Sequence, residues 1–208
     1  MIQISCVQLE IQQLLIYRDK ENSMEHLQAD NHPELFPWVL LVMSAISLQC
    51  FLVPFVFTVR VRSQVFNKEF MLQFEKEHKQ AFPEFPEDDI TKSIGFPDMG
   101  SGYYSKKLAY KDWFRFNNAQ RVHYNFLEAL PMILILLFIA GLKQPLAALI
   151  IGCVYFVARL LYLVSYVKSP NLRVIGVIPM SLSLLALFGL SLYTASQYMK
   201  LYKIDLGF

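Results

Sequence analysis

The amino-acid sequence predicts an all-α membrane protein in which four spanning helices run up and down as a bundle. Three observations lead to this fold class: 55% of the 208 residues are hydrophobic, only 17% are charged, and the mean hydropathy is +0.36. A soluble domain of this length carries fewer apolar and more charged residues. The net charge of +2 is too small to indicate a nucleic-acid partner, and the sequence contains no long basic block.

Four apolar segments are each long enough to cross a bilayer, which takes about 20 helical residues. We expect these spans at about residues 36–59, 116–142, 146–167 and 174–199. The second span must begin near Phe116, because the apolar run that follows Pro131 is too short to cross a bilayer by itself. Pro54 lies within the first span and should bend that helix or free a backbone carbonyl.

Two segments differ in character from the spans of the membrane domain, which we place at residues 36–208. Residues 1–35 form an N-terminal extension, where apolar residues at helical spacing predict an amphipathic helix on the membrane or on a partner. Residues 65–115 form a long charged loop. Phe66, Phe70 and Phe74 follow at steps of four in this loop, which predicts that the first helix continues beyond the bilayer with an amphipathic surface.

No metal site is expected from this sequence. Its three cysteines lack the spacing of metal ligands. Glu87, Asp88 and Asp89 form an acidic run with no second group of ligands nearby, so a solvated loop is the favoured interpretation.

Polar side chains recur within the second and third spans, where hydrocarbon makes each of them costly. Arg121, Asn125 and Glu128 share one face of the second span, because they follow at steps of four and three. Arg159 is the single charge inside the third span. Counted along their helices, Glu128 and Arg159 lie at compatible depths, and we expect them to form a neutralising pair. Ionisable groups inside a membrane are candidate functional sites.

Two motifs carry a resemblance to a known family. They are QRVHYNFLEALP at residues 120–131 and ARLLYLVSY at residues 158–166, followed by Arg173. In these motifs the chain resembles the membrane-associated proteins in eicosanoid and glutathione metabolism, and among them it is most similar to type 3 microsomal glutathione S-transferase. The resemblance covers about Phe36 to Met199, apart from much of the first loop.

The resemblance implies a homotrimer in the endoplasmic reticulum or mitochondrial membrane, with glutathione bound as co-substrate at each subunit boundary. By correspondence, the residues that bind glutathione would be Arg62, Arg121, His123, Asn125, Glu128, Tyr162 and Tyr166. Arg173 would be the catalytic residue that stabilises the glutathione thiolate, and Arg159 would be a structural charge within the membrane. The thiolate would attack a lipophilic electrophile or reduce a lipid peroxide.

Two positions depart from the family pattern. Ser63 stands where leukotriene-synthesising relatives have a second arginine, which weakens any prediction of that activity. Ala129 replaces an aromatic residue that some relatives place after the glutamate.

Two functions therefore stay open: a membrane glutathione transferase or peroxidase, and a structural subunit that keeps this fold inside a larger membrane complex without catalysis. The N-terminal extension and the first loop would be contact surfaces in the second case. A channel or transporter is disfavoured, because the polar stripes are too few to line a pathway.

Overall fold

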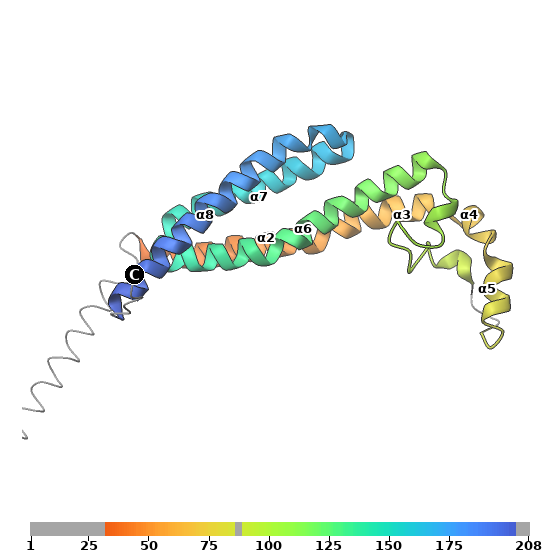
Figure 1. Cartoon of the computed structure of the whole chain (residues 1–208), viewed down its shortest axis with the longest axis horizontal. Helices are drawn as coiled ribbons and strands as arrows, with labels where there is room; N and C mark the ends of the chain where they lie inside the picture. The colour runs from red at the N-terminus through yellow and green to blue at the C-terminus, as the bar shows by residue number, and fades with distance from the viewer. Residues whose placement is uncertain (1–31, 86–88, 203–208) are drawn as a thin grey trace, which may run out of the picture. The chain divides into compact units, whose positions relative to one another are not determined.

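Residues 32–85 and 89–202 are described by a computed structural model, and within them every regular element is a helix (Figure 1). Four helical segments there are long and apolar enough to cross a membrane: Pro33–Val65, Tyr110–Lys143, Pro145–Tyr166 and Pro170–Leu201. The predicted all-α class with four spans is thereby confirmed. The amphipathic helix predicted for the N-terminal extension falls on residues 1–31, outside the described residues.

The described chain forms two compact units, and each of the four spans contributes to both of them. The first unit holds residues 32–44, 132–158 and 178–202, and the second holds 45–85, 89–131 and 159–177. Every residue that the sequence predicts for the site lies in the second unit.

The first span is interrupted where Pro54 stands. It consists of α2 (Phe36–Val53), the π-helical turn η2 (Pro54–Thr58) and α3 (Val59–Val65). Pro54 has no N–H to donate and its ring crowds the preceding turn. The chain accommodates it with a wider turn, in which the Val59 N–H donates to the Pro54 carbonyl. The Thr58 hydroxyl then donates to the Ala119 carbonyl at 3.2 Å, which ties this turn to the second span.

The second span is the helix α6 (Tyr110–Lys143), which begins earlier than the predicted start near Phe116. Its 34 residues extend about 51 Å at the usual helical rise. Because the hydrocarbon core is about 30 Å thick, the polar first turns of α6 extend beyond it.

The third and fourth spans are α7 (Pro145–Lys168) and α8 (Val174–Leu201), joined through the short helix η5 (Pro170–Arg173). Pro145 is the first residue of α7, a position where its missing N–H costs no helical hydrogen bond. In the second unit, α8 meets α7 at Gly176, where an added Cβ would lie 2.5 Å from the Tyr162 Cα. Glycine at this position permits the two backbones to approach closely.

The first loop does not continue the first helix, so that prediction was wrong. α3 ends at Val65, and two short helices follow, α4 (Lys68–Leu72) and α5 (Glu75–Ala81). Asn67 separates α3 from α4, because its side chain accepts from the Phe70 N–H at 2.9 Å and so caps a new helix. The phenylalanine stripe is folded inward instead, into a core made of Val65, Phe66, Met71, Phe74, Ile90 and Phe116.

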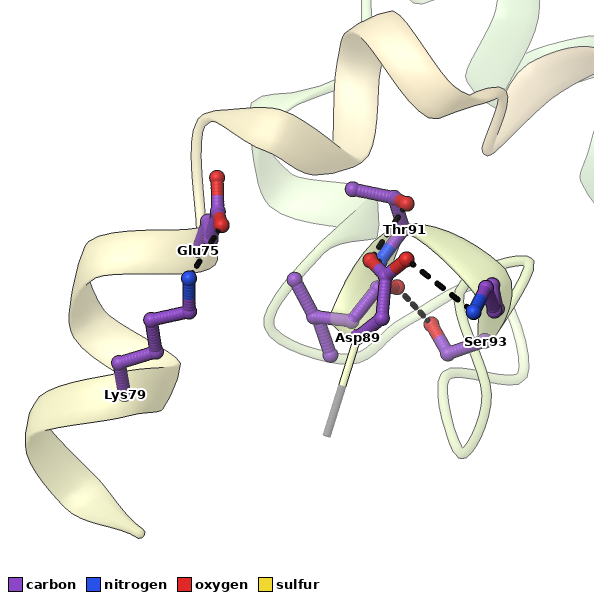
Figure 2. Close-up of polar contacts among 7 residues, drawn as sticks. Glu75, Lys79, Asp89, Thr91 and Ser93 are labelled. Carbon is purple, nitrogen blue, oxygen red and sulfur yellow. Dashed lines mark hydrogen bonds and ion pairs between the residues drawn. The ribbon is translucent and has the colours of Figure 1, made fainter. Parts of the chain in front are cut away.

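The acidic run ends in a local turn (Figure 2). Asp89 accepts from the Thr91 N–H at 3.0 Å and from the Thr91 hydroxyl at 2.6 Å, and so caps the short helix η3 (Ile90–Lys92). Figure 2 also shows Glu75 and Lys79, which pair at 2.6 Å one turn apart on α5. These contacts give Asp89 a structural role in the loop, while Glu87 and Asp88 lie outside the described residues.

Asp98 organises the end of the loop and is only 4% exposed. Its carboxylate accepts from the N–H groups of Gly100 (2.8 Å), Gly102 (2.9 Å) and Ser105 (2.7 Å), and from the Ser105 hydroxyl (2.7 Å). Burial by itself would raise the pKa of Asp98, but the hydrogen bonds from Ser105, Gly100 and Gly102 outweigh burial and hold that pKa below its ordinary value. Asp98 is therefore an ionised hub at neutral pH.

Replacing Gly176 by alanine should destabilise the fold by about 1–3 kcal/mol, because the new methyl group would meet the backbone of α7, which cannot move aside alone. Gly189→Ala on the same helix is the matched control, since an added Cβ there meets nothing within 4 Å. Thermal unfolding of the two variants in detergent, followed by circular dichroism, makes the comparison. Equal melting temperatures would contradict the close contact.

Candidate functional site

The predicted polar face of α6 is present in the second unit. Arg121 and Glu128 lie two turns apart, and the Arg121 Nη1 is 3.3 Å from a Glu128 carboxylate oxygen. Their side chains are 56% and 60% exposed in the single chain. Charges that face hydrocarbon are costly even as a pair, so this face requires a second molecule or a wet cavity against it.

The predicted pairing of Arg159 with Glu128 is wrong. It is 3% exposed, and its guanidinium donates to the Asn125 side-chain oxygen at 2.7 Å and to the Asn125 carbonyl at 3.1 Å. The Phe126 ring covers the same guanidinium at 4.4 Å. Arg159 therefore meets α6 nearly one turn before Glu128, and Glu128 pairs with Arg121 instead.

The two predicted tyrosines of α7 lie together next to this cluster. The rings of Tyr162 and Tyr166 are 5.4 Å apart, and both side chains are buried. Arg121, Arg159 and Arg173 all lie close enough to interact electrostatically with the Tyr162 hydroxyl. Three guanidinium groups from three different elements thus lie within electrostatic range of one tyrosine.

Arg173 and His123 are placed differently around this centre. Arg173 is the last residue of η5 and its side chain is exposed, so its guanidinium is accessible to a ligand. His123 is half-buried on α6, with its ring near that of Tyr124 at 6.2 Å.

Arg62 is buried, although the sequence predicts that it binds a ligand. It is 1% exposed, with the Phe96 ring 4.0 Å and the Phe116 ring 4.9 Å from its guanidinium carbon. One guanidinium nitrogen donates to the Met99 sulfur at 3.5 Å, while Nη1 has no hydrogen-bond partner. Phe96 and Met99 belong to the first loop, so this loop covers Arg62.

Gln120 is a polar residue of this region that the sequence reasoning did not single out. It is 2% exposed, and neither its amide oxygen nor its amide nitrogen has a hydrogen-bond partner. Its spacing could have indicated that it is buried, because Gln120 lies midway between Phe116 and Tyr124 on one face of a spanning helix. Within the described ranges, no group of His, Cys, Asp and Glu is arranged to hold a metal ion.

Replacing Asn125 by leucine should lower the stability by about 1.5–3 kcal/mol, the usual value of a hydrogen bond to a charged group, because it removes the side-chain acceptor of Arg159. Asn125→Asp keeps an acceptor and should restore most of the loss. Asn118→Leu, two turns earlier on α6, is the control, since its side chain makes no hydrogen bond among the described residues. Chemical denaturation in mixed micelles measures all three. If Asn125→Leu lowers the stability no more than Asn118→Leu does, Asn125 does not hold Arg159.

The sequence that forms this site matches a known protein family. Residues 38–193 match the MAPEG family, the membrane-associated proteins in eicosanoid and glutathione metabolism. The match covers more than half of the chain and includes every predicted site residue. The family includes glutathione transferases and related eicosanoid enzymes, and it supports a membrane function connected with glutathione. With its four apolar spans, the chain is an integral membrane protein that belongs to the MAPEG family.

Proposed function

We propose that this protein is an integral membrane glutathione transferase or peroxidase whose glutathione site is built on the second unit. The observation that carries the proposal is the polar cluster in which Arg159 donates to Asn125 at 2.7 Å and lies 5.8 Å from the Tyr162 ring. Arg121 and Arg173 lie within electrostatic range of the same tyrosine. Such a density of positive charge in spanning helices favours an anionic ligand.

The ligand chemistry fits this cluster group by group. Glutathione carries two carboxylates, one amine and a thiol. A guanidinium binds a carboxylate through two parallel hydrogen bonds, and Arg121 is exposed for that purpose. Glu128 would accept from the ligand amine, since it already pairs with a cation in the free protein. The Arg121–Glu128 pair thus presents both charge signs before the ligand arrives.

Arg159 prepares Asn125 for its proposed role. Because Arg159 donates to the amide oxygen of Asn125, the Asn125 NH₂ group remains to donate to a ligand oxygen. The Tyr162 and Tyr166 hydroxyls and His123 would supply the remaining polar contacts. Arg159 itself acts as a positioning residue, because it is buried and its contacts are made to Asn125 and to neighbouring rings.

Arg173 would supply the chemical step. A free thiol with a pKa of about 8.5 is only a few per cent thiolate at neutral pH. Lowering that pKa by about two units takes roughly 2.7 kcal/mol of preferential thiolate stabilisation, which one guanidinium can provide once water is excluded. The thiolate would then form a carbon–sulfur bond with an electrophile as its leaving group departs. Alternatively, two glutathione molecules would reduce a lipid peroxide to an alcohol and water and be oxidised to the disulfide.

The partners follow from the exposure of the site. The Arg121–Glu128 pair faces outward in the single chain. A second copy of the chain would lie against it, in a homotrimer with glutathione at each subunit boundary. The second substrate would be a lipophilic molecule that arrives from the bilayer. The proposed membrane is that of the endoplasmic reticulum or the mitochondrion.

One observation favours the alternative, a structural subunit of a larger membrane complex. The first loop covers Arg62, one of the residues that the resemblance assigns to glutathione. A subunit that has lost catalysis has no need of an accessible arginine there, and its loop would contact other subunits.

Two substitutions should separate binding from chemistry. Arg121→Ala should weaken glutathione binding about 10- to 100-fold, because it removes a charge-assisted contact. Arg173→Ala should leave the affinity nearly unchanged but lower the conjugation rate about tenfold or more, and raise the pH at which that rate is half-maximal. Calorimetry measures the affinity, and conjugation of a chlorinated nitrobenzene measures the rate.

Arg60→Ala and Lys168→Ala are the matched controls, since both remove exposed cations near the ends of spans. Both should behave as the unaltered protein. Absence of glutathione binding to the purified protein, together with its co-migration in a large complex, would favour the structural subunit instead.

A further inference from the structure

Arg62 on α3 and Gln120 on α6 are two buried polar residues of the second unit, and the first loop covers Arg62. The two side chains are 1% and 2% exposed. Three of their polar atoms have no hydrogen-bond partner: the Arg62 Nη1 and both amide atoms of Gln120. Buried groups of this kind are normally paired, so each exception needs an explanation.

Arg62 lies against α6, the helix that carries Gln120. Phe116, Gln120 and Tyr124 follow at steps of four and so share one face of α6. The Arg62 guanidinium lies 4.9 Å from the Phe116 ring and interacts electrostatically with the Tyr124 hydroxyl. Gln120 lies between these two contacts, on the face of α6 that Arg62 covers.

The cover over Arg62 is the turn of residues 96–102, which we call the cover segment. Over the Arg62 guanidinium, this segment is a single layer of side chains. Phe96 and Met99 contact the Arg62 guanidinium directly, yet their own outer surfaces remain 50% and 45% exposed. These two side chains are therefore the part of the loop that separates Arg62 from the outside.

The cover segment is attached at its edges. Just after it, the Tyr104 ring packs on Phe74 at 4.7 Å and the Tyr103 hydroxyl donates to Glu77 at 3.0 Å, so these tyrosines anchor the end of the loop. Asp98 gathers the N–H groups of the cover segment into one turn, as described above. The Gly100 carbonyl accepts from the Trp113 indole at 3.1 Å and from the Asn117 amide at 3.0 Å, which attaches the segment to the start of α6. Because the closed arrangement leaves polar atoms unpaired beneath it, a ligand that pairs them favours opening.

We propose that the cover segment is a lid, and that its opening admits a carboxylate group of the ligand to Arg62 and Gln120. The guanidinium Nη1 and the amide NH₂ of Gln120 would each donate to one carboxylate oxygen. Identification of that carboxylate as one of the two in glutathione rests on the proposed function. The lid and Gln120 are features of this chain's own loop and core, and they explain how a buried Arg62 is compatible with binding.

Chemical labelling of arginine tests the lid without reference to activity. Phenylglyoxal modifies exposed guanidinium groups, and mass spectrometry locates the product. Arg60 is exposed on α3 two residues before Arg62, and it serves as an internal control. In the unaltered protein Arg62 should react about tenfold more slowly than Arg60, as expected for a group that reacts only through local opening.

Asp98→Asn should loosen the lid, because an amide oxygen cannot replace both carboxylate oxygens that hold the turn. Labelling of Arg62 should rise about fivefold in this variant, and that of Arg60 should not change. The double substitution Phe96→Ala and Met99→Ala removes the cover directly and should have the same effect. Continued protection of Arg62 in both variants, with circular dichroism and gel filtration unchanged, overturns the lid.

Hydrogen exchange in the presence of glutathione tests the ligand. Saturating glutathione should speed exchange at the N–H groups of Gly100 and Gly102 in the unaltered protein. Gln120→Leu should fold normally, since it removes unpaired polar atoms, yet bind glutathione about tenfold more weakly. If glutathione binding depends on Arg121, yet glutathione neither speeds exchange at Gly100 and Gly102 nor binds Gln120→Leu more weakly, the lid is overturned. That result leaves the proposed function standing. Absence of binding in every variant overturns the proposed function, and with it the ligand assigned to the lid.

Discussion

Burying the Arg159 guanidinium in an apolar helix is the constraint on which the second unit depends. A cation in such a place must be satisfied by oxygen atoms and aromatic faces, or the helix cannot stay in the bilayer. Asn125 and Phe126 of α6 supply both. This contact fixes which side of α6 faces α7, and it leaves Arg121 and Glu128 on an outward face. The same interaction therefore stabilises the fold and exposes the candidate site.

The four spans could be predicted because hydropathy and length act through the bilayer alone and need no knowledge of neighbours. The shared face of Arg121, Asn125 and Glu128 could be predicted for a similar reason, since helical spacing fixes it. The partner of Arg159 could not, because Glu128 and Asn125 lie less than one turn apart and only the packing of α7 on α6 decides between them. Compatible depth permits a pair but does not select one.

The first loop shows the other limit of the sequence. The stripe of Phe66, Phe70 and Phe74 is compatible with one long helix, and nothing in its spacing reveals that Asn67 starts a new helix and turns the rings inward. Burial of Arg62 follows from this loop, because Phe96 and Met99 reach it from 34 and 37 residues along the chain. Family correspondence gives Arg62 a role, whereas the structure shows what covers it. The proposed lid reconciles the two.

We propose that the polar groups of α6 and α7 share one face because together they bind a small, doubly acidic thiol peptide. An experimental structure of the purified protein in a lipid nanodisc with glutathione would show whether they do. We expect density of the size of glutathione between two copies of the chain, in contact with Arg121 of one copy and Tyr162 of the other. A subunit with no second copy beside it, whose Arg121 and Glu128 satisfy only each other, would disprove the proposed site.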